Sequence, residues 1–223
     1  MDIVLSKRLS TIASLVEKDS IVADIGADHG YLICSLVKNN IIKKGYAVEN
    51  KKGPYKHLCE TITKNRLNDG IVTYFDSGIL PLNDEVNTLV LAGMGSENII
   101  DILSKRPDYV SNNINHIICD SHTNQYYLRQ QMCKFGFKIE KEIILKEGNI
   151  FYEIISFKKD QIENYSNLEL KYGPILMKNK SDIFLEKYRL LINKYNDLLT
   201  KDLSLVRKEE IIKELKEIKS IID

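Results

Sequence analysis

The amino-acid sequence predicts an α/β protein built on a seven-stranded, doubly wound sheet with an antiparallel edge. Short apolar runs alternate with helical patterns up to residue 135, as parallel strands joined by right-handed crossovers do. Two longer strand patterns then flank the turn signal Glu147-Gly148-Asn149, which predicts a terminal hairpin. Beyond residue 160 the pattern changes to long amphipathic helices. The sequence therefore predicts a Rossmann-like sheet followed by an α-helical hairpin.

The elements of the sheet region follow in a regular order. A helix over 5–16 is predicted because Leu5, Leu9, Ile12 and Val16 recur at helical spacing. Compact apolar runs, each bounded by a polar or glycine-containing turn, predict parallel strands over 21–25, 45–49, 71–76, 88–92 and 116–119. Helices are expected between or after them, over 30–39, 53–67, 96–105 and 124–135.

The rest of the chain divides into a hairpin, an irregular stretch and two helices. Strands are predicted over 137–145 and 150–157, and the polar segment 161–180 reads as irregular, with a turn at Tyr172-Gly173-Pro174. Apolar residues at three- and four-residue steps predict helices over 183–199 and 205–222, folded into an antiparallel pair. We expect a domain over 1–160 and a helical domain over 161–223.

Composition limits the classes of partner. The 223 residues carry 32 basic and 31 acidic side chains, and neither half is strongly basic, so a nucleic-acid partner requires a local patch of Lys and Arg. The four cysteines form no CxxC pair, and we expect no metal site. No apolar run reaches the about 18–20 residues of a membrane span. We expect a cytoplasmic, monomeric protein without membrane contact.

The turn after the first strand is the most informative segment. It reads Asp24-Ile25-Gly26-Ala27-Asp28-His29-Gly30, and glycines there let the backbone approach a ligand. The following helix N-terminus favours a carboxylate, and Asp24 suits an ammonium group. Asp28 stands where it would repel a pyrophosphate, so S-adenosylmethionine fits this turn better than a dinucleotide. A purely structural turn, with Asp28 and His29 as helix caps, is the alternative.

Further residues at strand ends extend the predicted cofactor site. Glu49, with Asn50 beside it, ends the second strand and is placed to accept hydrogen bonds from ribose hydroxyls. Two more groups of residues end the third and fourth strands: Asp76, Ser77 and Gly78, and then Gly93 and Met94. The first group is suited to adenine recognition, and the second lies at the expected methyl-transfer position. Ordinary turn chemistry explains both groups nearly as well.

These motifs together resemble the bacterial tRNA (adenine(22)-N1)-methyltransferase family, a group of class I methyltransferases. The specific parts are the Asp28-His29 pair within the first motif and the stretch Ala92-Gly93-Met94-Gly95. The resemblance covers almost the whole chain, because that family also carries a C-terminal helical hairpin. It implies methyl transfer from S-adenosylmethionine to N1 of an adenine in the tRNA D-arm.

The chain departs from the family pattern at two loops. Asp76-Ser77-Gly78 stands where Gly-Asp-Gly is common, and Asp120-Ser121-His122 stands where the family commonly has Gln-Pro-Asn. The direction of the acid at the first loop and base recognition at the second are therefore open. Two alternative functions remain: a methyltransferase for a small molecule or protein, and a tRNA-binding homologue without catalysis.

The expected chemistry needs few protein groups. N1 of neutral adenine already carries a lone pair, so no covalent intermediate, metal or strong base is required, and the candidates near the donor are Asp28 and His29. An N1 in a paired arm must be exposed by extrusion of its nucleotide. Residues expected at the substrate side are Lys7, Arg8, Tyr31, His122 and Tyr126. Basic residues of the helical pair alternate with acidic ones, which favours a solvated face.

Overall fold

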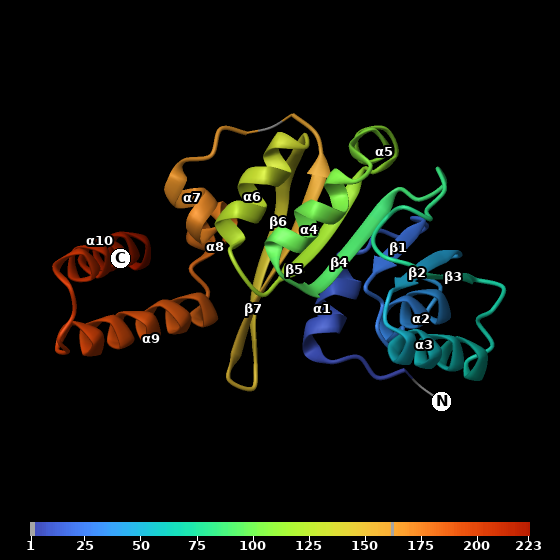
Figure 1. Ribbon diagram of the computed structural model, residues 1–223, viewed down its shortest axis with the longest axis horizontal. Helices are drawn as coiled ribbons and strands as arrows, with labels where there is room; N and C mark the ends of the chain where they lie inside the picture. Colours follow the sequence, from blue (N-terminus) through green and yellow to red (C-terminus); the bar gives the residue numbers. More distant parts are fainter. Residues whose placement is uncertain (1–2, 162) are drawn as a thin grey trace.

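The computed structural model describes residues 3–161 and 163–223, and its centre is one sheet of seven strands (Figure 1). The strand order is β3-β2-β1-β4-β5-β7-β6; β1 to β5 run parallel and β7 runs antiparallel to β5 and β6. The predicted sheet with an antiparallel edge is therefore confirmed. The strands are β1 Val22–Ile25, β2 Gly45–Glu49, β3 Ile71–Phe75, β4 Thr88–Met94, β5 His116–Ser121, β6 Phe137–Glu147 and β7 Ile150–Lys159.

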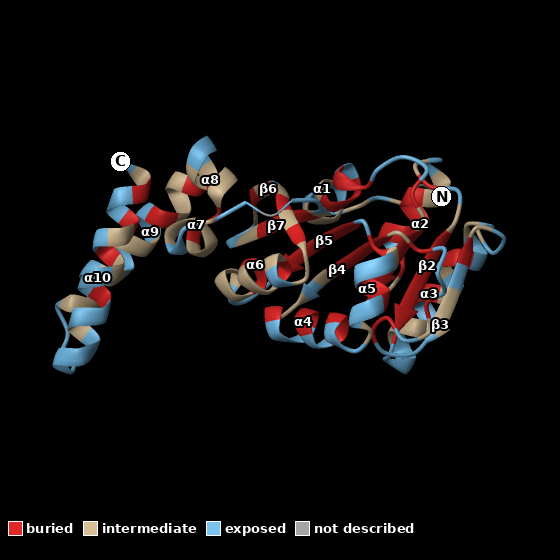
Figure 2. Cartoon of the chain, turned by 90° about the horizontal axis from the view of Figure 1, so that it is seen from above, coloured by how far each residue is buried: buried red, intermediate tan, exposed pale blue. Residues whose placement is uncertain are grey.

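Helices cover both faces of the sheet. One apolar core joins the sheet to α1 (Lys7–Leu15), α2 (Tyr31–Lys38) and α3 (Lys52–Lys64). A second core joins the opposite face to α4 (Ser96–Ser104), α5 (Pro107–Asn113) and α6 (Gln125–Lys134). The central strands are almost wholly buried between them (Figure 2), which explains why their sequences are continuous apolar runs rather than alternating ones.

The strand order places a topological switch point beside β1. From β1 the chain first builds outward through β2 and β3, and it then returns to the other side of β1 for β4 and β5. Loops leaving the carboxyl ends of β1 and β4 therefore diverge to opposite faces, and a crevice opens between them. The predicted site residues follow these strand ends.

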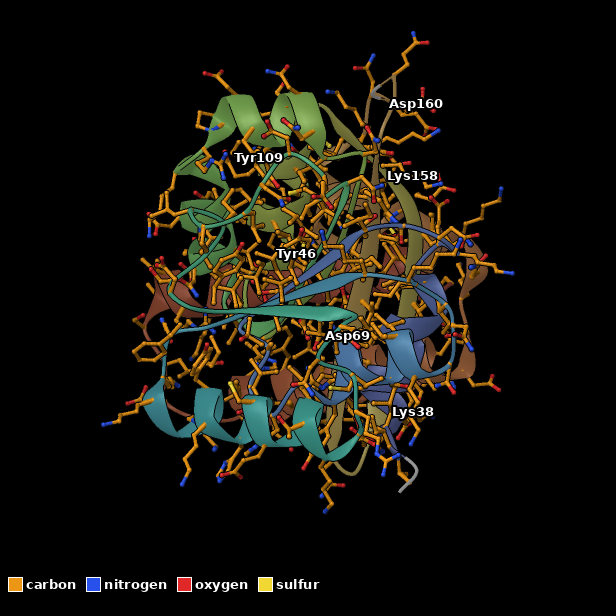
Figure 3. The ribbon with its side chains drawn as sticks, turned by 90° about the vertical axis from the view of Figure 1, so that its right-hand side faces the viewer. Lys38, Tyr46, Asp69, Tyr109, Lys158 and Asp160 are labelled. Atoms are coloured by element: carbon orange, nitrogen blue, oxygen red, sulfur yellow. The ribbon has the colours of Figure 1, made fainter. Side chains whose placement is uncertain are left out.

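A hydrogen-bonded cluster fixes the long connection from β3 to β4 against the second core. Asn83 donates from Nδ2 to the Tyr46 hydroxyl at 2.9 Å, and the Tyr109 hydroxyl donates to the Asn83 carbonyl at 2.7 Å. Both tyrosines lie on the same side of the sheet, away from α3 (Figure 3). The connection is thus held although it has no regular secondary structure.

Three short helices were absent from the sequence-based prediction. These are α5, α7 (Asn167–Tyr172) and α8 (Pro174–Asn179), and the last two lie where an irregular segment was expected. Each begins with a local signal: Pro107 and Pro174 occupy first-turn positions, and Ser166 forms a capping box with Glu169. The expectation of irregular structure over 161–180 was wrong because caps and tertiary packing stabilise helices too short to show periodicity.

The C-terminal helices α9 (Asp182–Leu199) and α10 (Leu205–Ile222) form the predicted hairpin and extend from the β6 end of the molecule (Figure 1). Phe184 and Tyr188 of α9 pack with Ile144 of β6 and with the apolar side of α10. No helix in the described part of the chain is long and apolar enough to span a membrane. The division into domains at residue 160 stays a prediction, since α7 and α8 contact both parts.

A buried charge network fastens this hairpin to the sheet. Arg129 of α6 donates from Nε to Glu142 at 2.7 Å and from Nη2 to Glu153 at 2.8 Å, and the three side chains are at most 4% exposed. Lys187 of α9 binds the other oxygen of Glu153 at 2.5 Å. Glu142 also accepts backbone N–H groups at the start of α8. Burial raises the pKa of Glu153, but Lys187 and Arg129 outweigh it and lower that pKa.

Removing the central cation of this network will destabilise the protein strongly. Arg129→Met leaves Glu142 and Glu153 buried with incomplete compensation, and we expect the free energy of unfolding to fall by about 3–5 kcal/mol. Arg207→Met, which breaks only an exposed pair with Glu210, should leave the unfolding midpoint almost unchanged, because water and salt screen exposed ion pairs. Urea unfolding followed by circular dichroism measures both; equal midpoints for the two variants would contradict the role given to Arg129.

Candidate functional site

A cavity of about 670 Å³ opens at the carboxyl ends of β1 to β4, at the switch point. All of the predicted cofactor-binding residues except Gly30 line it, together with three of the predicted substrate-side residues. This set comprises Arg8, Asp24, Gly26, His29, Tyr31, Glu49, Asn50, Asp76, Ser77, Gly78, Gly93, Met94 and His122, and the catalytic candidate Asp28 lines the cavity as well. The structure thus brings together residues more than a hundred positions apart in the sequence.

The turn from β1 to α2 is held in a left-handed path. Gly26, Asp28 and Gly30 all have positive φ, at 75°, 50° and 72°, and this conformation is strained for residues with a Cβ. A Cβ on Gly30 would also lie 2.3 Å from Leu58 Cδ1. Gly30 therefore forms the packed back of the turn, while Gly26 and Asp28 face the cavity. Because Gly30 is the N-cap of α2, no side chain closes that helix end.

Glu49 connects the first two loops of the site. One of its carboxylate oxygens accepts the backbone N–H of Asp28 at 3.0 Å and the other accepts that of Lys51 at 2.8 Å. The side chain is 5% exposed, yet it lines the cavity. Each oxygen retains a further lone pair, so Glu49 can fix the loops and still accept hydrogen bonds from a ligand.

Asp24 is a buried carboxyl group with unusual electrostatics. Burial, reinforced by the nearby charge of Glu49, raises its pKa from 3.8 to about 7, although Arg8 acts in the opposite direction. No group within residues 3–161 and 163–223 donates a hydrogen bond to its carboxylate. Its ionised form is therefore poorly stabilised by the protein alone, and a cationic ligand group in the cavity would relieve that cost.

The third wall of the cavity comes from the loop after β3. Asp76 is exposed, and its Oδ1 accepts the backbone N–H of Ser77 at 2.6 Å. Gly78 has a φ of 74°, and a Cβ there would lie 3.2 Å from Ile102 Cγ2. The carboxylate of Asp76 is thus turned toward its own loop but keeps one oxygen available for a ligand amino group.

The fourth strand ends in a turn with little bulk. Gly93 has a φ of 79°, and a Cβ there would approach Arg8 Nη1 at 3.6 Å and His122 Nε2 at 3.8 Å. Met94 reaches across the cavity floor, its Cε lying 3.2 Å from the position that a Cβ on Gly26 would take. The absence of a side chain at Gly93 leaves room between the β1–β3 side and the β5 side of the cavity.

The predicted substrate-side residues divide into two groups. Arg8, Tyr31 and His122 line the cavity, whereas Lys7 and Tyr126 do not. The backbone N–H of Lys7 donates to Glu147 at 2.8 Å, which fixes the start of α1 to the β6–β7 hairpin. Tyr126 lines a separate groove, together with residues of α7 and Glu217 of α10. Tyr126 therefore does not stack on a base inside this cavity, because it lies outside its walls.

Three residues that contact the predicted site residues were not identified as site residues from the sequence. His57 of α3 stacks on His29, which in turn stacks on Tyr31, with centroid separations of 5.0 and 5.7 Å. Asp120 had been noted only as part of an altered loop, and Tyr152 of β7 not at all. No local motif marks His57 or Tyr152, because their contacts arise between elements distant in sequence.

Known proteins resemble this chain over most of its length. Residues 5–155 match a family model described as a methyltransferase domain. A Bacillus subtilis tRNA (adenine(22)-N(1))-methyltransferase is 30% identical over 190 residues, covering 82% of this chain and 79% of the relative. The chain belongs to this methyltransferase family.

Solved structures agree in fold from end to end. A Streptococcus pneumoniae protein provisionally assigned as a tRNA (m1A22) methyltransferase superposes with a TM-score of 0.94 at 28% identity, covering 99% of this chain and 100% of that one. Its complex with S-adenosyl-L-methionine gives a TM-score of 0.91 at the same identity and coverage. The likeness includes the C-terminal helices, which the family model does not span.

The raised pKa of Asp24 predicts a pH-dependent stability. Between its unfolded value near 3.8 and its folded value of about 7, the folded state keeps a proton that the unfolded state has released, so stability falls as pH rises through this window. Asp24→Asn abolishes that loss. We expect the melting temperature of the ligand-free variant to exceed that of the wild type increasingly from pH 4 to 7, at about 2–4 °C per kcal/mol.

Differential scanning fluorimetry across this pH range measures the effect. Glu60→Gln, at an exposed pair on α3, should follow the wild-type curve throughout. A constant difference between Asp24→Asn and the wild type at every pH would contradict the assignment.

Proposed function

We propose that the protein methylates N1 of adenine 22 in tRNA, with S-adenosylmethionine as methyl donor. The observation that carries this proposal is the acid-lined cavity at the switch point of a chain belonging to a family whose Bacillus subtilis relative is named for that reaction. The bound S-adenosylmethionine in the Streptococcus pneumoniae structure supports the choice of donor.

The residues present fit the donor. Asp24 would face the methionine ammonium, because a cation there offsets its buried negative charge. The uncapped start of α2 suits the methionine carboxylate. Glu49, oriented by the two backbone N–H groups, would accept the ribose hydroxyls, and Asp76 and Ser77 would meet the adenine amino group. Asn50, Gly78 and Met94 would complete the walls.

The chemistry requires orientation more than acid–base catalysis. When bound, the donor supplies an activated methyl group on a sulfonium. The protein's task is to hold an extruded adenine with N1 in line with that group and to exclude water. Gly93 leaves the space for it, and Tyr31 and His29 stand at the rim. Asp28 lies 3.7 Å from His29, so this pair offers negative charge near the base as it becomes cationic.

The proposed tRNA substrate would contact a surface wider than the cavity. The hairpin α9–α10 extends from the β6 edge of the sheet (Figure 1), whereas the cavity lies at the ends of β1 to β4, and a tRNA is long enough to contact both. A small metabolite or a protein substrate is the competing possibility carried from the sequence, as is a homologue that binds tRNA without methylating it. We propose a cytoplasmic location, where tRNA is modified, and a monomeric state.

Donor binding should depend on pH through Asp24. Only the carboxylate pairs with the ammonium, so the affinity for S-adenosylmethionine should fall about tenfold per pH unit below pH 7. Asp24→Asn should bind weakly and without this dependence, while Glu60→Gln should match the wild type. Isothermal titration calorimetry between pH 5.5 and 8.5 provides the measurement, and an affinity for the wild type that is flat over this range would place the ammonium elsewhere.

The activity itself is tested with methyl-labelled donor and unmodified tRNA transcripts. We expect label in a transcript with adenine at position 22, recovered as N1-methyladenosine after nuclease digestion, and none in a matched transcript with guanine there. At pH 8.5, where Asp24 of the wild type is ionised, Asp24→Asn should lose at least about tenfold in rate at subsaturating donor. Label in both transcripts would refute the position, and label in neither, with donor bound, would favour the inactive homologue or a non-tRNA substrate.

A further inference from the structure

The side of the cavity beyond β4 is built from three elements distant in sequence. Asp120 near the end of β5 pairs in register with Ile154 of β7, so the β7 residues before Ile154 project past the carboxyl edge of the sheet. Tyr152 lies on this projection, and its ring meets His122 edge-on at a centroid separation of 6.2 Å. The start of α1, with Arg8, closes the third side.

Arg8 is held tightly on this side. Its Nη1 donates to Asp120 Oδ2 at 2.5 Å, and its guanidinium lies over the Tyr152 ring, 5.6 Å from the centroid. Asp120 is fully buried, and its second oxygen has no hydrogen-bond partner among the described residues. The Arg8 side chain is 23% exposed. The buried carboxylate of Asp120 thus forms an ion pair with a guanidinium that still faces the cavity.

Arg8 also lies where an acceptor must enter. The donor-side acids occupy the ends of β1 to β3, which leaves the space above Gly93 for the acceptor. Arg8 Nη1 and His122 Nε2 flank that space at 3.6 and 3.8 Å from the position of a Cβ on Gly93. A guanidinium has five N–H donors, and those not used by Asp120 remain for a neutral acceptor such as a purine ring nitrogen.

The reaction imposes a charge problem at this position. The N1 lone pair forms a bond to the methyl carbon while the carbon–sulfur bond breaks, its electron pair remaining on sulfur as a neutral thioether. The positive charge therefore passes from the sulfonium to the base. An uncompensated guanidinium beside the base would repel the charge that develops there in the transition state.

We propose that Asp120 is a positioning residue that cancels the charge of Arg8, so that Arg8 can hydrogen-bond the acceptor base without opposing its conversion to a cation. This inference rests on the proposed function. It assigns the ion pair to the acceptor side of the site, with the Tyr152 ring limiting how far the guanidinium can move.

A double-mutant cycle tests the proposal. Initial rates of methylation over a series of tRNA concentrations are measured at pH 8.5, where Asp24 is ionised, for wild type, Asp120→Asn, Arg8→Gln and the double variant, all with saturating donor. We expect Asp120→Asn to lower the rate at saturating tRNA at least about tenfold without raising the KM for tRNA. The double variant should be faster than Asp120→Asn, because it no longer carries the unpaired cation. The donor Kd should stay within about twofold of wild type, and Glu60→Gln should leave the rate unchanged.

Other outcomes overturn the proposal. If the double variant loses rate by the product of the two single-variant losses, Asp120 does not act through the charge of Arg8. A parallel loss of donor affinity would assign the pair to the donor side, and a raised KM with unchanged rate would make it a simple binding contact. If Asp120→Asn yields no folded protein by thermal melting, Asp120→Ser replaces it; failure of both to fold makes the pair a folding element. Wild type that leaves tRNA unlabelled refutes the proposed function instead.

Discussion

The two hydrogen bonds that Glu49 accepts from the backbone of Asp28 and Lys51 are the constraint on which the site depends. They join the loop after β1 to the loop after β2, so the position of the left-handed turn through Gly26 is coupled to that of the acid at the end of β2. The same carboxylate lies close enough to Asp24 to help raise its pKa. Shape and charge on the donor side therefore have a common origin.

This arrangement places stability and function in opposition. Burying Asp24 near Glu49 disfavours its ionised form in the ligand-free protein, and a donor carrying an ammonium group gains what the protein alone loses. Arg129, by contrast, is buried between Glu142 and Glu153 and finds its compensation within the chain. The first cluster lines the cavity and leaves the charge of Asp24 incompletely compensated, whereas the second fixes the C-terminal hairpin to the sheet.

Much of the fold and of the donor side was predictable because the signals are local. Apolar runs ending at Asp24, Glu49 and Asp76 mark strand ends, and parallel strands bring such ends to one edge of a sheet. The short helices α5, α7 and α8 were missed since one or two turns show no periodicity. Tyr126 was expected near the substrate from its place after β5, but the direction of α6 carries it to a separate groove.

The sequence by itself determined the sheet, the glycine turn after β1 and the class of ligand that its strand-end acids suit, because each depends on residues a few positions apart. Only the tertiary structure decided that Arg8 and Asp120, 112 positions apart, form an ion pair beside Gly93. It also decided that Tyr152 covers that pair. Such contacts follow from strand order, register and the projection of β7 beyond the sheet edge, none of which a local pattern encodes.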